Sequence, residues 1–284
     1  MRAFAASVQE VFHEAAARWT LIAYFALSTL FILIFAAAVN LDVVNGALAG
    51  IKLFGQSVDV GDRHIEIDQL VLGFESTFSG VLYFVGLFLA LFATAHLVPR
   101  LQEKGTIDLY LSRPIGRVAL LLSRYTGGLL LAAADIVYLI GSIGVIVAWK
   151  TRVFHPRFFL SGAVILFTIA ALMAFAFLIG VVTSSTAVSL MATYAVFFLA
   201  AILSFHDSIA AAVSTEFAAK TVDTLYWVLP KTAELGKATV ALVAGAEAPD
   251  RLAHLNHFGI YGSTALFGIA ALALASWLFS RKDF

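Results

Sequence analysis

One acidic residue stands out because it lies inside an otherwise apolar stretch. Asp135 follows Tyr125 by ten residues, within a run that carries no other charge. A carboxylate near the centre of a bilayer costs about 2.5–3.5 kcal/mol on insertion scales, so it should face protein or a water-filled cavity. Two interpretations stay open. Asp135 lines a possible translocation path or binds a cation or proton, or it is a hydrogen-bonded packing contact between helices.

The remaining residue types form no recognisable catalytic or metal site. His254 and His257 are three residues apart, which suits a metal on a helix, but the sequence fixes no third ligand, and solvated surface histidines are the better interpretation. The chain has no Cys, which excludes disulfides and thiolate chemistry. It also has no Gly-x-x-x-x-Gly-Lys-Ser/Thr loop for phosphate. We therefore expect no catalytic residue, no metal and no cofactor in this chain.

The polar segment at residues 99–117 is the most informative part of the sequence. It reads Pro-Arg-Leu-Gln-Glu-Lys-Gly-Thr-Ile-Asp-Leu-Tyr-Leu-Ser-Arg-Pro-Ile-Gly-Arg. Gly105 permits a sharp change of chain direction, and Thr106 is suited to cap the start of a short helix. Pro114 disfavours helix at Arg113 and can occupy the first turn of the next helix. The pattern predicts a short transverse helix that is joined rigidly to the elements on both sides.

The elements that position these residues must be membrane helices. Hydrophobic residues make up 61% of the 284, and charged residues only 13%, about half of the share in soluble globular proteins. The mean hydropathy is +0.95. Eighteen basic and eighteen acidic residues give a net charge of zero, so nothing in the composition suggests nucleic-acid binding. The sequence predicts an all-α, polytopic membrane protein.

Six stretches are long and apolar enough to cross a bilayer, which needs about 20 helical residues. They are Trp19–Val39, Phe78–Val98, Tyr125–Trp149, Phe158–Val182, Ala187–Phe205 and Ile260–Phe279. Before the first span, apolar residues recur at helical spacing and predict an N-terminal amphipathic helix at the membrane interface. These are Phe4, Val8, Val11, Phe12 and Ala15.

The two long loops that the spans leave, residues 40–77 and 206–259, are predicted to lie outside. In the first, apolar and acidic residues alternate over 58–60 and 65–68, on both sides of Gly61–Asp62, a pattern that suits a small hairpin and an irregular loop equally well. The second is too long to lack structure. Two helices are expected there, at Asp207–Lys220 and Lys231–Ala246.

Basic residues indicate the orientation. An even number of spans places both termini on one side, and residues 99–117 carry four basic residues in 19, as cytoplasmic loops do. Arg117 and Arg124, seven apart, share a helix face from which they could reach lipid phosphates. We expect a multi-pass protein of the cytoplasmic (inner) membrane with both termini cytoplasmic. Three basic residues conflict with this assignment because they would face outward: Lys150, Arg152 and Arg157.

The segment Glu-x-Gly-Thr-x-Asp-x-x-Leu-Ser-Arg-Pro-x-x-Arg, between the second and third of six spans, resembles the permease subunits of ATP-binding-cassette (ABC) exporters. The match is to the type-2 family with the type V exporter fold. The position of Trp227–Pro230 before the last span, and of Phe279–Phe284 after it, agrees. The resemblance covers essentially all of residues 1–284, as a single transmembrane permease domain.

The resemblance implies partners and a site. Such permeases pair with a second copy or a homologous permease, and a separate ATPase subunit binds the ATP and Mg. Their cytoplasmic segment contacts the ATPase and couples its closure to movement of the spans. The residues that match this coupling helix are Glu103, Gly105, Thr106, Asp108, Arg113 and Pro114. Otherwise these residues only cap a short connecting helix.

Three functions remain open on the sequence. The first is the permease subunit of an ABC exporter, which is not itself an enzyme. The second is a six-span secondary transporter or channel that uses Asp135. The third is a non-transporting membrane anchor built on a permease scaffold.

Overall fold

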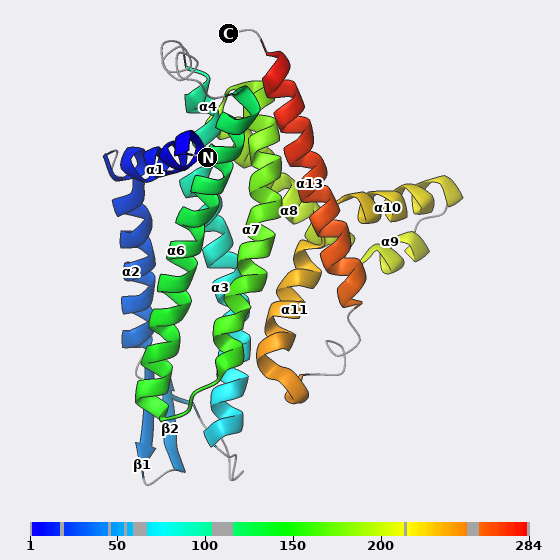
Figure 1. Ribbon diagram of the computed structural model, residues 1–284. Helices are drawn as coiled ribbons and strands as arrows, with labels where there is room; N and C mark the ends of the chain where they lie inside the picture. Colours follow the sequence, from blue (N-terminus) through cyan, green and yellow to red (C-terminus); the bar gives the residue numbers. More distant parts are fainter. Residues whose placement is uncertain are drawn as a thin grey trace.

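The body of the protein is a bundle of long helices, seen in a computed structural model (Figure 1). It describes residues 2–17, 20–44, 47–53, 56–58, 67–103, 116–212, 215–248 and 256–282. The N-terminal helix and the end of the last helix lie at the same end of the bundle, and a small sheet lies at the opposite end.

The long helices carry the predicted spans. They are α2 (Thr20–Ala38), α3 (Ile67–Thr94) continued by α4 (Leu97–Leu101), α6 (Arg117–Thr151), α7 (Pro156–Thr183), α8 (Thr186–Leu203) and α13 (His257–Arg281). Within the described part of the chain, five helical stretches are long and apolar enough to cross a membrane, and the last five predicted spans fall on them, apart from the turn that follows α8. The first predicted span falls on α2, whose apolar stretch Leu21–Ala37 is shorter.

Helix α7 forms the centre of the bundle. It contacts α13, α6, α11, α8 and α3, and much of its length is buried. Gly268 on α13 makes one of these contacts possible, because a Cβ there would lie 3.0 Å from the Cα of Ala171 on α7. Small residues of this kind let membrane helices approach closely.

The first long loop differs from the prediction. Strands β1 (Val39–Val44), β2 (Ala47–Leu53) and β3 (Gln56–Val58) form an antiparallel sheet in that order, with Val39 opposite Leu53. The predicted turn at Gly61–Asp62 lies outside the described residues. The alternating pattern that ends at Asp68 does not end in a strand, because α3 already begins at Ile67. The helix extends this far since Val71 and Glu75 are buried against the bundle.

The second long loop is helical, as expected, but with an additional break. It contains α9 (His206–Ala212), α10 (Glu216–Val228), α11 (Thr232–Ala244) and the short 3-10 helix η1 (Gly245–Glu247). A single helix over Asp207–Lys220 is therefore wrong: Thr215 has extended backbone and directly precedes the new helix α10. Figure 1 shows α10 projecting sideways from the bundle.

The structure explains two of the three basic residues that conflicted with the predicted orientation. Lys150 Nζ donates a 3.0 Å hydrogen bond to the carbonyl oxygen of Ala36, in the last turn of α2. The Arg157 guanidinium lies against Gly245, the residue that ends α11. The last carbonyls of a helix lack intrahelical partners and carry partial negative charge, so both cations lie where helix ends favour them.

Gly245 should not tolerate a side chain. Its φ of 59° and ψ of −122° suit glycine, and a Cβ would overlap the Arg157 guanidinium. We expect Gly245→Ala to lower the free energy of unfolding by about 1–3 kcal/mol, seen as a lower Tm in detergent. Gly262→Ala on α13 is the control, because a Cβ there meets nothing within 4 Å. Equal Tm values for the two variants would contradict this account.

Candidate functional site

The candidate site is a polar cluster at the end of the bundle where both chain ends lie. It consists of Gln102, Arg117, Ser184 and Lys282, and we call it the Lys282 cluster. Gln102 directly follows α4, Arg117 begins α6, Ser184 ends α7, and Lys282 ends α13. Gln102 and Arg117 therefore flank the informative polar segment on both sides, although residues 104–115 themselves lie outside the described residues.

Gln102 holds the entry to this segment. Its Nε2 donates to the carbonyl oxygen of Gly180 at 2.8 Å. Its Oε1 accepts hydrogen bonds from Lys282 Nζ at 2.5 Å and from Ser184 Oγ at 3.0 Å. Lys282 Nζ also donates to the carbonyl oxygen of Val181 at 2.8 Å. One side chain thus connects the end of α4 to the α7–α8 turn and to the end of α13.

Arg117 holds the exit from the segment. Its Nη1 donates to the carbonyl oxygen of Lys282 at 2.7 Å and to that of Ser280 at 3.3 Å. These carbonyls belong to the last turn of α13 and its cap, which lack intrahelical donors. Both flanks of the segment consequently contact the same few residues at the end of the last helix.

Close packing supports the cluster. Gly180 on α7 lies so near α4 that a Cβ there would be 3.3 Å from Pro99 Cδ and 3.4 Å from Val98 Cβ. Burial lowers the pKa of the Lys282 ammonium below the ordinary value of a lysine. Three acceptors surround that ammonium, as its three N–H donors require.

Of the predicted coupling residues, the structure describes Glu103. It is exposed, and its backbone N–H donates to the carbonyl oxygen of Arg100 at 3.1 Å. Its carboxylate is accessible to a partner. The other five residues assigned by resemblance lie outside the described residues: Gly105, Thr106, Asp108, Arg113 and Pro114.

Asp135 is fully buried at the middle of α6, facing α2. Its Oδ2 accepts a 2.9 Å hydrogen bond from Ser28 Oγ. The Tyr24 hydroxyl interacts electrostatically with the carboxyl group, but neither it nor Asp135 Oδ1 makes a hydrogen bond of ordinary geometry within the described residues. This hydrogen bond joins α6 to α2 and fits the packing interpretation, and a role in the translocation path stays a prediction.

Sequence reasoning missed the role of Arg124. The expectation that it reaches lipid phosphates is wrong: its side chain is 3% exposed, and Nη1 lies 2.5 Å from Glu14 Oε2 on α1 (Arg2–Ala17). Next to this pair, the α1 residue Val11 packs where Gly127 of α6 has no side chain. Helix α1 covers the residues for which an amphipathic helix was predicted, and this ion pair attaches it to α6. The residues around Glu14 in the sequence gave no indication that it pairs with Arg124, 110 positions away.

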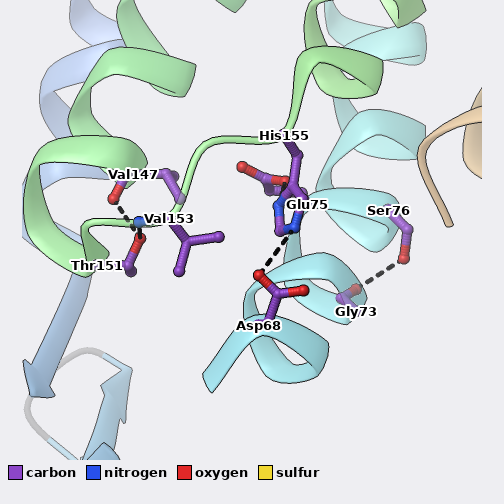
Figure 2. A network of polar contacts seen from close by, with 8 residues as sticks. All are labelled: Asp68, Gly73, Glu75, Ser76, Val147, Thr151, Val153 and His155. Carbon is purple, nitrogen blue, oxygen red and sulfur yellow. Dashed lines mark hydrogen bonds and ion pairs between the residues drawn. The ribbon is translucent and has the colours of Figure 1, made fainter. Parts of the chain in front are cut away.

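His257, one of the two histidines expected to be solvated, is exposed, whereas two other histidines contact neighbouring side chains. His155 lies between two carboxylates of α3, with Nδ1 2.7 Å from Glu75 Oε2 and Nε2 3.4 Å from Asp68 Oδ1 (Figure 2). His206 stacks on Tyr226, with ring centroids 3.7 Å apart. His254 lies outside the described residues. Within the described residues, no cluster of His and acidic side chains could hold a metal ion.

A second buried cation connects α10 to α11. Lys231 is 2% exposed, donates to the carbonyl oxygen of Tyr226, and lies 3.2 Å from the centroid of that ring. Burial lowers its pKa from 10.5 to about 8. Between these values the unfolded chain binds more protons than the folded protein, so the free energy of unfolding should rise with pH.

Lys231→Met should therefore weaken the pH dependence of stability. Between pH 8 and pH 10, the free energy of unfolding of the wild type should rise relative to that of Lys231→Met by up to roughly 1.4 kcal/mol per pH unit. This rise is measured as an increase in Tm in detergent. Lys220→Met, at an exposed position of α10, should behave as wild type. A parallel pH profile for wild type and Lys231→Met would overturn the assignment.

Comparison with known proteins agrees with this architecture. The family model described as ABC-2 family transporter protein matches residues 10–284. No curated protein matches the chain. The match covers all of the helices described above except the first half of α1, including both flanks of the polar segment. The chain therefore belongs to the ABC-2 family of transporter proteins.

Proposed function

We propose that the chain is the permease subunit of an ABC exporter in the cytoplasmic membrane. Proteins of this family are transport components that work with an ATPase subunit. The substrate would cross between the helices of two permease copies, and the separate ATPase subunit would bind ATP and Mg. In this proposal α2 also crosses the membrane, which brings the number of spans to six. Its 17 apolar residues extend about 26 Å, near the thickness of the hydrocarbon core.

The Lys282 cluster is the observation that carries the proposal. A force applied to residues 104–115 reaches Gln102 on one side and Arg117 on the other, and both contact the end of α13. Gln102 also contacts Gly180 at the end of α7. A displacement of the segment by an ATPase would therefore move α4, α6, α7 and α13 together. Both termini, at this same end, would be cytoplasmic.

Assembly with the ATPase subunit tests the proposal. The two subunits are co-expressed and purified through a tag on the permease, and bound ATPase and ATP hydrolysis are measured. Glu103→Ala and Gly105→Pro should reduce one or both, while Glu216→Ala, at an exposed position of α10, should change neither. Normal assembly and stimulated hydrolysis in both segment variants would refute the coupling assignment.

The place of Asp135 in the translocation path needs its own measurement. Asp135→Asn keeps an acceptor for Ser28 and removes the charge. If Asp135 lines the path, transport by the assembled complex should fall while Tm stays near wild type. Loss of Tm without a specific change in transport per folded complex assigns Asp135 to packing. Transport that persists without any ATPase but is lost in Asp135→Asn would favour a secondary transporter.

A further inference from the structure

An apolar groove lies between α3, α8 and α11. Its volume is about 350 Å³, within the range of small-molecule sites in proteins. Tyr83 and Phe84 come from α3, Phe197 comes from α8, and Thr232 and Lys237 come from α11. Three separate elements thus form one concave surface.

Small residues keep the groove open and aromatic rings form its walls. Gly80, Ala201, Ala233 and Gly236 line it, so little side-chain volume fills the space. Tyr83 is 1% exposed, and its hydroxyl donates to the carbonyl oxygen of Thr232 at 2.6 Å, which fixes α3 against the start of α11. A rigid apolar trough of this kind accommodates a hydrocarbon chain better than a polar solute.

Lys237 gives the groove a charge. Of the described residues that line the groove, only Lys237 carries a charge, and its side chain is exposed. Its Nζ lies 5.6 Å from the centroid of the Phe205 ring, just beyond the end of α8. Within the described residues no carboxylate lies within ion-pair distance of it. An apolar trough whose ammonium has no carboxylate partner among the described residues is complementary to an amphiphile with an anionic head.

We propose that this groove binds the acyl chain of an anionic amphiphile, with the acidic head at Lys237, and that such a molecule is the cargo. The second half of this inference rests on the proposed function. A second copy of the chain fits the groove less well, because an apolar protein face over Lys237 would desolvate its exposed ammonium. A cationic amphiphile would be repelled by the same ammonium.

Photolabelling tests the binding. The full chain is purified in detergent, exposed to palmitic acid that carries a diazirine, irradiated and digested, and the labelled peptides are identified by mass spectrometry. Label should concentrate on the groove residues of α3, α8 and α11. Unlabelled palmitate should compete, and hexadecyltrimethylammonium, with the same chain length and opposite charge, should compete poorly.

Matched variants separate this groove from general lipid contact. Ala201→Leu fills the groove and should reduce labelling about tenfold, whereas Ala195→Leu, at an exposed position of the same helix, should not. Lys237→Gln should reduce labelling about fivefold and abolish the preference for the anion, with Lys220→Gln as control. Label spread evenly over the spans, or unaffected by both groove variants, would overturn the inference. So would a shift from dimer to monomer in Ala201→Leu with unchanged labelling.

The ATPase assay separates the two proposals. Palmitate should stimulate ATP hydrolysis by the assembled complex, and Ala201→Leu should remove that stimulation. If an ATPase subunit assembles and hydrolyses ATP but the groove is not labelled, the groove inference fails alone. If the groove is labelled but no ATPase subunit assembles, binding is supported and the exporter function fails.

Discussion

Replacing Lys282 with methionine should lower the stimulated ATP hydrolysis of the assembled complex by about tenfold, while the amount of assembled complex stays the same. Lys282 Nζ donates to Gln102, Val181 and Ser184, so this one ammonium joins the entry of the polar segment to the α7–α8 turn. Hydrogen bonds to a charged group contribute about 1.5–3 kcal/mol, and 1.4 kcal/mol is a factor of ten. Methionine keeps much of the side-chain volume but cannot donate.

Arg281→Met is the matched control for this variant. Arg281 is adjacent, basic and exposed, and its guanidinium lies over the Trp277 ring, 4.3 Å from the centroid. Hydrolysis should be measured with and without substrate, because uncoupling removes the stimulation rather than the basal rate. Gln102→Met should reproduce the effect, and the double variant should be no worse than either single one. Full stimulation in Lys282→Met would exclude this cluster from coupling.

The second large effect concerns the attachment of the N-terminal helix. Glu14→Ala should lower the free energy of unfolding by about 2–3 kcal/mol. The Arg124 side chain is only 3% exposed, and the substitution removes the carboxylate that it pairs with. Glu14 is itself 23% exposed, which keeps the effect below that of a fully buried pair. We expect a lower Tm in detergent and faster proteolysis within α1.

Two further variants give this prediction its control. Gln9→Ala changes an exposed residue of the same helix and should leave Tm and proteolysis unchanged. The double variant Glu14→Leu/Arg124→Leu should recover much of the lost stability, because it replaces both charges of the pair instead of only one. If Glu14→Ala is as stable as Gln9→Ala, the ion pair does not hold α1 to α6.

The structure also changes the meaning of the charges that the sequence could not place. Lys150 and Arg157 conflicted with a charge rule that concerns loops near the membrane. In the folded protein Lys150 donates to the last turn of α2 and Arg157 covers the end of α11. Because both cations contact the ends of helices, their positions say less about the orientation of the protein than the charge rule assumes. Arg152, which ends α6 in a left-handed conformation and is exposed, has no such explanation.

The sequence by itself determined the class of the protein and the position of most helices. Hydropathy is a local property, and in lipid the backbone groups of a span must form hydrogen bonds within their own helix. For this reason the bounds of the predicted span Phe158–Val182 agree closely with those of α7. The family resemblance of residues 103–117 could also be read from consecutive residues. Both inferences needed no knowledge of which helices touch.

Only the tertiary structure decided which polar side chains meet. Gln102 and Lys282 are 180 positions apart, and Arg124 and Glu14 are 110 apart. The rotation and neighbours of each helix follow from packing of small residues over the whole bundle, which no local pattern encodes. For the same reason Asp135 was recognisable as buried, but its contact with Ser28 on another helix was not.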